Sequence, residues 1–195
     1  MKSICVFCGS GIGARPAYRQ AATALAGELA ERGLQLVFGG GRVGLMGVLA
    51  DAALAAGVHV TGVIPRRLQA LEVGHQGLDE LRVVGSLSER KALMADMADA
   101  FVALPGGLGT LDELFEMLTW SQLGLHHKPS GLLNVDGYFD PLLAFMGHMA
   151  GEGFIHGEGP SLLLHATVPT DLLDAMASWQ PVPLDKASWA LKQIS

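Results

Sequence analysis

Short runs of hydrophobic residues alternate along this chain with longer segments in which hydrophobic positions recur every three or four residues. The short runs predict strands at residues 3–8, 34–38, 59–64, 81–84, 100–104, 130–134 and 161–165. The periodic segments predict helices at residues 16–32, 45–56, 88–98, 111–123, 141–152 and 169–178. A strand that is hydrophobic at every position, such as residues 100–104, requires burial on both faces. Its alternation with helices predicts an α/β fold with a doubly wound parallel sheet.

The pattern contains no repeat, no low-complexity linker and no break that would divide the 195 residues. We therefore expect a single domain over residues 1–180. Residues 181–195, which include Pro181 and Pro183, are expected to form a C-terminal tail.

Charge narrows the classes of partner. The net charge is −6, and lysines and arginines form no stripe, so neither a nucleic acid nor a membrane surface is an expected partner. A small phosphorylated ligand needs only a few amides and one or two cations, and it remains compatible with the sequence. The N-terminal hydrophobic run is too short for a signal peptide, and no run reaches the length of a membrane span. We expect a cytoplasmic protein.

The two cysteines, Cys5 and Cys8, form a CxxC pair that raises the question of redox chemistry. A redox pair opens a helix after a strand, whereas Cys5 lies inside the first hydrophobic run. Residues three apart in an extended strand point to opposite faces. The pair is therefore interpreted as structural.

Glycines gather where three of the predicted strands end, at residues 9 and 11, 39–41, and 106, 107 and 109. Ligands of doubly wound sheets bind beyond those carboxyl ends. Residues 9–14 and 39–44 fit the glycine pattern of dinucleotide-binding loops, but that fingerprint also needs an acidic residue at the end of the second strand. Glycines occupy that place here. The loops therefore favour a nucleotide or sugar phosphate over a dinucleotide.

The most specific passage is residues 104–116, where a buried strand ends in proline and three glycines precede a predicted helix that starts at Thr110. Thr110 and Glu113 have the spacing of a capping box, in which Glu113 would only bind the backbone amide of Thr110. Three glycines directly upstream favour a ligand-facing carboxylate instead. Glu113 and Glu116 share a helix face, and the helix N-terminus is expected to keep both ionised.

A second cluster of charge opens the helix predicted at residues 88–98. Ser86 and Glu89 have capping spacing, yet Arg90 and Lys91 place two cations near the positive end of the helix dipole. A bound phosphate would compensate for that placement. The alternative is a pair of solvated surface side chains.

The segment Pro105 to Glu113 matches the PGGxGTxxE signature of the Lonely guy family, the cytokinin riboside 5′-monophosphate phosphoribohydrolases. The resemblance covers roughly the first 160 residues and includes residues 6–10, 39–47, 62–65, 90–94 and 131–138. It implies a Rossmann-like fold, a homodimer with each site near the subunit interface, and no cofactor.

The same resemblance implies the site residues. Arg90 and Glu113 match the catalytic pair. The positions that contact substrate match Glu72, Lys91, Gly107, Leu108, Gly109, Thr110, Leu111, Asp112 and Thr119. Gly9, Ser10, Gly40 and Gly41 are expected on the phosphate-side loops, and Glu116 is a possible helper. No metal ligands are expected, because His126 and His127 lack a carboxylate at ligand spacing.

Members of the family often carry the name lysine decarboxylase, which the residues do not support. A pyridoxal phosphate enzyme needs a Schiff-base lysine, and of the five lysines only Lys91 falls in a motif. The expected reaction is hydrolysis of the N-glycosidic bond of an adenosine 5′-monophosphate, with or without an N6 substituent, releasing free base and ribose 5-phosphate. Glu113 would act either as a base or as an electrostatic partner.

Two alternatives stay open. A prenylated base needs a hydrophobic slot, for which Met94, Trp120 and Leu123 are candidates, whereas AMP itself needs none. A general nucleoside monophosphate glycosidase is therefore the nearest alternative. The second alternative is a non-catalytic nucleotide-binding carrier. A carboxylate of Glu113 that faces the ligand would favour an enzyme over such a carrier.

Overall fold

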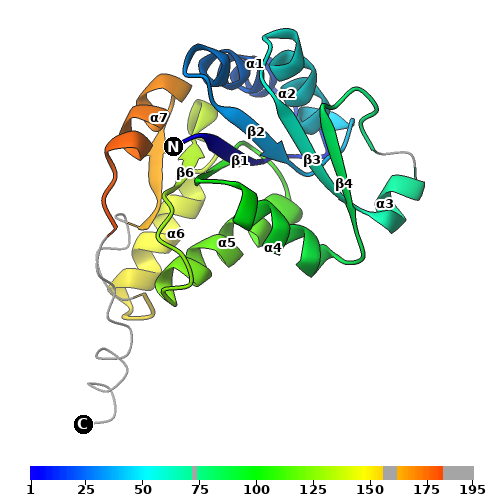
Figure 1. Ribbon diagram of the computed structural model, residues 1–195. Coiled ribbons are helices and arrows are strands. Elements are labelled where there is room, and N and C mark those ends of the chain that lie inside the picture. Colours follow the sequence, from blue (N-terminus) through cyan, green and yellow to red (C-terminus); the bar gives the residue numbers. More distant parts are fainter. Residues whose placement is uncertain (72–73, 156–161, 182–195) are drawn as a thin grey trace.

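The computed structural model describes residues 1–71, 74–155 and 162–181. Seven parallel strands form one sheet in the order β4-β3-β2-β1-β5-β6-β7 (Figure 1). The strands are β1 Ser3–Phe7, β2 Gln35–Phe38, β3 Val60–Pro65, β4 Glu80–Val84, β5 Ala100–Ala103, β6 Ser130–Leu133 and β7 Leu164–Ala166. This confirms the predicted doubly wound parallel sheet.

Helices cover both faces of the sheet (Figure 1). They are α1 Pro16–Glu31, α2 Gly44–Ala55, α3 Arg66–Ala70, α4 Leu87–Met97, α5 Leu108–Gln122, α6 Asp140–Gly151 and α7 Pro169–Ser178, with the short 3-10 helix η1 at Val135–Gly137. The hydrophobic cluster on one face includes residues of α1, α2 and α7, and the cluster on the other face includes residues of α4, α5 and α6. The molecule therefore has three layers, with β1 and β5 at its centre.

Side chains of β1 alternate between the two clusters, because successive residues of a strand point to opposite faces. Ile4 and Val6 pack on the α1 side, whereas Cys5 and Phe7 pack on the α5 side. Cys8 belongs with the α1 side, so the two cysteines lie on opposite faces as predicted. Burial raises the pKa of both thiols, which keeps them protonated. The structural interpretation of the CxxC pair fits this arrangement.

The strand order reverses at β1, which pairs with β2 on one side and with β5 on the other. The chain leaves these three strands at the same edge of the sheet through loops that contain the glycine clusters. In a doubly wound sheet, the crevice at such a reversal is where ligands bind. The topology thus brings together the three glycine loops that are far apart in the sequence.

Several predicted boundaries need correction. Helix α5 begins at Leu108, three residues earlier than predicted, and its N-cap residue is Gly107. The helices α3 and η1 were not predicted from the sequence. The last strand begins at Leu164, and residue 161 of its predicted range lies outside the described residues, as do residues 182–195 of the predicted tail. None of the helices in the described segments is long and hydrophobic enough to cross a membrane.

Candidate active site

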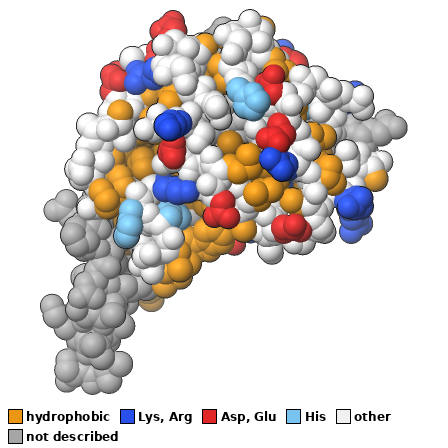
Figure 2. All heavy atoms as spheres, viewed as in Figure 1, with side chains coloured by type: hydrophobic (Ala, Val, Ile, Leu, Met, Phe, Trp, Pro, Cys, Tyr) orange, Lys and Arg blue, Asp and Glu red, His pale blue; other side chains and the backbone are white. Residues whose placement is uncertain are grey.

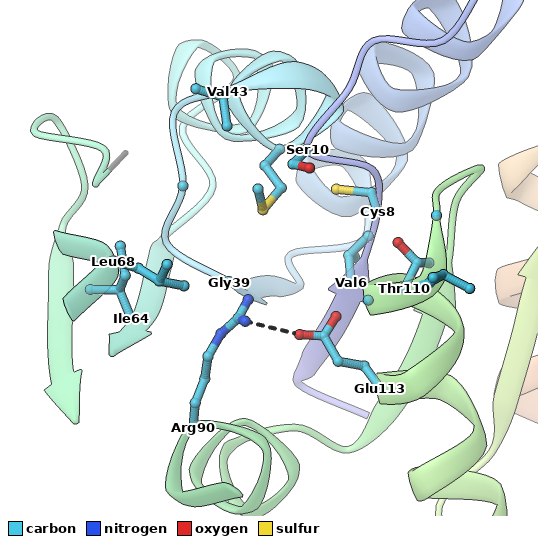
Figure 3. A pocket seen from close by; sticks show the side chains of 15 residues that line it. Val6, Cys8, Ser10, Gly39, Val43, Ile64, Leu68, Arg90, Thr110 and Glu113 are labelled. Carbon is cyan, nitrogen blue, oxygen red and sulfur yellow. Dashed lines mark ion pairs between the residues drawn. The ribbon is translucent and has the colours of Figure 1, made fainter. Parts of the chain in front are cut away.

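A cleft with a volume of about 390 Å³ opens at the carboxyl ends of β1 and β2, within the size range of small-molecule sites (Figure 3). Its walls come from the loops that follow β1, β2 and β5 and from the first turns of α2, α3, α4 and α5. The lining residues are Val6, Cys8, Ser10, Gly39, Gly41, Val43, Met46, Ile64, Leu68, Arg90, Gly107, Leu108, Gly109, Thr110 and Glu113.

Arg90 and Glu113 face each other across this cleft (Figure 3). Nη1 of Arg90 lies 3.2 Å from Oε1 of Glu113, and the two side chains are only 12% and 11% exposed. Nε of Arg90 also donates a hydrogen bond of 3.0 Å to the backbone carbonyl of Val63. The guanidinium is therefore held from two directions, by β3 and by α5.

Gly39 makes room for that guanidinium. A Cβ atom at this position would overlap Nη2 of Arg90 and would contact the sulfur of Met46 at 3.4 Å. The missing side chain at the end of β2 thus leaves the space that the Arg90 guanidinium from α4 occupies. This is a packing reason for a residue that the sequence presented only as part of a phosphate loop.

Burial dominates the electrostatics of Glu113. Removal from water raises the pKa of the carboxyl group, and the nearby Arg90 guanidinium opposes that rise without cancelling it. The expectation that the helix N-terminus keeps Glu113 ionised stays a prediction, and burial acts against it. A carboxyl group whose pKa is raised accepts a proton more readily than an ordinary glutamate, and the cation at 3.2 Å fixes its position in the cleft.

The loop before α5 provides backbone donors at the cleft. Because α5 begins at Leu108, the amides of Leu108, Gly109 and Thr110 form its first turn, where N–H groups have no partner within the helix. The next amide, that of Leu111, already has a partner in the helix, because it donates a hydrogen bond of 3.2 Å to the carbonyl of Gly107. Such a helix end attracts anions, and three of the predicted substrate contacts lie on it.

The capping-box interpretation of Thr110 and Glu113 is wrong. Thr110 is the third residue of α5, and the Gly107 N-cap makes no side-chain hydrogen bond. Glu113 therefore does not fold back onto the helix start, and its carboxylate is paired with Arg90 instead. In α4 the predicted cap is confirmed, because Oγ of Ser86 accepts a hydrogen bond of 3.1 Å from the Glu89 amide.

The second cation of α4 points to a different group of acids. Nζ of Lys91 lies 3.0 Å from Asp112 and 2.6 Å from Glu116. Burial lowers the pKa of Lys91, but its contacts with Glu116 and Asp112 outweigh burial and raise the pKa overall. Carboxylates of α5 thus neutralise both cations at the start of α4. The sequence alternative of two solvated surface side chains is wrong, since Lys91 is only 14% exposed.

The structure separates the predicted site residues into two groups. Ser10, Gly41, Arg90, Gly107, Leu108, Gly109, Thr110 and Glu113 line the cleft. Gly9, Gly40, Lys91, Leu111, Asp112, Glu116 and Thr119 are not among the lining residues of the described segments. Gly9 lines a neighbouring cavity, and Thr119 is exposed, with its hydroxyl bonded to the Phe115 carbonyl. Glu72 lies outside the described residues.

The hydrophobic wall of the cleft consists of residues that the sequence analysis did not identify, namely Val43, Met46, Ile64 and Leu68. The predicted slot residues do not line it. Met94 is 1% exposed in the core, Trp120 packs against the same core, and Leu123 is 53% exposed. Within the ranges that the structure describes, no three His, Cys, Asp or Glu side chains gather as a metal site would require.

Comparison with known sequences gives a consistent set of relatives. The family model described as "possible lysine decarboxylase" matches residues 46–176. A cytokinin riboside 5′-monophosphate phosphoribohydrolase of Arabidopsis thaliana is 48% identical over 180 residues, which are 92% of this chain and 83% of the relative. An enzyme of the same name from Oryza sativa subsp. japonica is 48% identical over 180 residues, covering 92% of this chain and 74% of the relative.

Solved structures support the fold. The molybdenum cofactor binding protein of Rippkaea orientalis matches with a TM-score of 0.69 and 24% identity, over 91% of this chain and 97% of that protein. Identity at that level establishes a shared fold only. Together with the parallel sheet, it confirms the Rossmann-like architecture.

Proposed function

This chain belongs to the Lonely guy family of cytokinin riboside 5′-monophosphate phosphoribohydrolases, and on that premise we propose that its cleft hydrolyses the N-glycosidic bond of an N6-modified adenosine 5′-monophosphate. The products are the free base and ribose 5-phosphate. The observation that carries the proposal is the buried pair of Arg90 and Glu113 beside a helix N-terminus. The family's other name, lysine decarboxylase, does not describe this reaction.

The first turn of α5 is assigned to the 5′-phosphate. Backbone amides of residues 107–110 border the cleft, and the positive end of the helix dipole favours a dianion there. Ser10 and Gly41 approach the same space from the loops after β1 and β2. Binding the phosphate at this end would direct the ribose and the base toward Glu113 and the hydrophobic wall.

Glu113 is assigned to the ribose. Cleavage of the N-glycosidic bond develops positive charge at the anomeric carbon, which a nearby carboxylate stabilises. Water supplies a hydroxyl group to that carbon and gives its proton to Glu113, whose raised pKa suits this role. The departing base takes the electron pair of the broken bond, and Arg90 stabilises its negative charge with a charge-assisted hydrogen bond. The proton taken up by Glu113 then passes to the base, which restores the carboxylate and gives the neutral free base.

The hydrophobic wall favours a substrate with an apolar group on the base. Val43, Met46, Ile64 and Leu68 line the cleft and offer no charged atom to a ligand. Figure 3 shows Val43, Ile64 and Leu68 on the side of the cleft away from α5. A prenyl group at N6 of adenine would remove this surface from water, at roughly 25 cal/mol for each Å² buried. Plain AMP would leave it hydrated. We therefore expect the prenylated nucleotide to be the better substrate.

A second copy of the chain is the proposed protein partner. Hydrophobic side chains gather over α5 and α6 (Figure 2). Four hydrophobic residues within or shortly after these two helices are each more than half exposed, namely Leu123, Leu125, Phe145 and Phe154. Exposed hydrophobic patches mark protein interfaces. A homodimer through this face would also bring Thr119 of α5, and Lys91 with its partners Asp112 and Glu116, near a subunit boundary. The cytoplasmic location and the domain limits at residues 1–180 stay predictions.

The direct test is release of free base from purified protein. AMP and isopentenyladenosine monophosphate are incubated separately with the wild type and with Glu113→Gln, and the base is measured by chromatography. Release by the wild type alone supports the proposal, and the ratio of the two rates reports the substrate preference. A folded wild type that binds either nucleotide without releasing base would favour the carrier function instead.

A further inference from the structure

Tyr138 lies at the end of a tightly held turn between β6 and α6, outside the cleft described above. The side chain of Asn134 fixes this turn by accepting a hydrogen bond of 2.8 Å from the Phe139 amide and donating one of 2.7 Å to Asp140. The turn contains Asp136, whose φ of 51° is the single positive value found among non-glycine residues of the described segments. A left-handed aspartate persists only where its surroundings hold it.

Tyr138 is 40% exposed, and two aromatic neighbours fix the direction of its ring. It packs edge-on against Tyr18 of α1, with ring centroids 5.5 Å apart, and against Phe139, with centroids 4.9 Å apart. From this position its hydroxyl group donates a hydrogen bond of 2.6 Å to the carbonyl oxygen of Gly106. That bond joins the β6–α6 turn to the loop that precedes α5, across 32 residues of sequence.

The bond determines the direction of the next amide. The carbonyl of Gly106 and the N–H of Gly107 belong to one planar trans peptide, so they point in opposite directions. Tyr138 borders a second cavity, of about 320 Å³, which shares only Ser10 and Gly107 with the cleft. Because Tyr138 holds the carbonyl on its own side, the N–H of Gly107 points away from Tyr138, and Gly107 is one of the residues that line the cleft.

This peptide needs such a support because glycines stand on both sides of it. Glycine adopts both signs of φ with little cost, so an unsupported Gly106–Gly107 peptide can rotate and withdraw its N–H. No side chain can replace Gly106, since its Cβ would overlap Oγ1 of Thr110 and lie 2.8 Å from the Gly9 amide. The orientation of the loop must therefore come from a neighbouring element.

We propose that Tyr138 is a positioning residue for phosphate binding, because its hydrogen bond to Gly106 orients the Gly107 amide that the substrate's 5′-phosphate contacts. The proposal rests on the assignment of the α5 N-terminus to that phosphate. Its consequence concerns binding and not the chemical step. Loss of the hydroxyl weakens binding of the phosphate by the same amount in the substrate complex and in the transition state. KM therefore rises and kcat stays nearly unchanged.

The test compares the wild type with Tyr138→Phe, which keeps the ring and removes only the donor. We expect KM for AMP to rise about tenfold, as one lost hydrogen bond predicts, with kcat nearly unchanged. Calorimetric titration with ribose 5-phosphate should show its Kd rising by the same factor, while the Kd of adenine stays constant. Tyr18→Phe is the matched control, because it removes a hydroxyl from the neighbouring ring and leaves the donor to Gly106 in place.

The titration separates this proposal from the reaction itself, since it requires no turnover. An unchanged Kd for ribose 5-phosphate in Tyr138→Phe would overturn the positioning role, whatever the catalytic result. An equal fall in kcat for Tyr138→Phe and Tyr18→Phe, with a lower Tm in both, would also overturn it and show that the ring pair is only structural. A wild type that binds ribose 5-phosphate without hydrolysing AMP would contradict the proposed function alone.

Discussion

The Arg90 guanidinium lies 3.2 Å from the Glu113 carboxylate in a cleft that excludes most solvent from both side chains. The two groups come from different helices, α4 and α5, and each has a second constraint. Arg90 is bonded to the Val63 carbonyl, and the carboxylate has lost most of its hydration. Breaking such a pair from one side leaves the other charge buried and uncompensated.

Replacing Glu113 by glutamine keeps the shape of the side chain and removes its charge and basicity. We expect kcat to fall by about 10²–10⁴-fold, the usual contribution of a positioned acid or base. Binding of AMP should change little, because the phosphate is assigned to the backbone of α5. Base release measures the first quantity and calorimetry the second. Retention of more than half of the wild-type rate would remove Glu113 from the mechanism.

The pH dependence follows from the raised pKa of Glu113. If the ionised carboxylate is the active form, activity falls as pH decreases through that pKa, so the acid limb of kcat/KM has its midpoint above 4.5, the ordinary value for a glutamate. Arg90 lowers this pKa, so its removal in Arg90→Gln should move the carboxyl titration further upward. Titration of the side-chain carboxyl by NMR in both proteins checks the direction. A downward shift in Arg90→Gln would contradict the assignment.

Gly39 provides a test of the guanidinium position without altering either charged residue. In Gly39→Ala the new methyl group overlaps Arg90, which must leave either the Val63 carbonyl or the carboxylate. We expect kcat/KM to fall about tenfold or more, as loss of one hydrogen bond to a charged group predicts. Gly27→Ala in α1 is the matched control, because its Cβ meets no atom within 4 Å. It should keep full activity and gain about 0.5–1 kcal/mol of stability. Equal activity in both variants would be inconsistent with the proposed packing.

The hydrophobic wall predicts selectivity. Leu68→Ser replaces a half-buried lining side chain of α3 with a smaller polar one. We expect the preference for isopentenyladenosine monophosphate over AMP, measured as the ratio of kcat/KM values, to fall about tenfold, since contacts worth one or two methylene groups discriminate on that scale. The value for AMP itself should stay near that of the wild type. A parallel loss on both substrates would show that Leu68 supports the fold and does not contact the N6 group.

The sequence predicted the sheet because its central strands are continuous hydrophobic runs. Boundaries failed where two local signals compete. Thr110 and Glu113 have capping spacing, yet the helix starts at Leu108, because glycines can enter the first turn when the backbone is needed there. Helix α3 is only five residues long, too short for a periodic pattern to be recognised.

The charged residues of the site were predicted from the sequence, and its hydrophobic lining was not. Arg90 and Glu113 stood out because charges near a helix start and beside glycines are unusual. The hydrophobic lining did not, because Met46 and Leu68 have the same pattern as core residues. Met94 has that pattern too and lies in the core. Only the packing of helices on the sheet decides which hydrophobic side chain remains open to a ligand.

The strand order has a consequence for the growing chain. The first half of the sequence builds β1 to β4 outward to one edge, and α4 then carries the chain back to the centre, where β5 pairs with β1. A nascent chain that has emerged only through α4 holds Arg90 without a partner carboxylate. Glu113 arrives only with α5, after the crossover is complete. The strand reversal that creates the cleft therefore also delays it, because the Arg90–Glu113 pair cannot form until the chain has been synthesised through the first turns of α5.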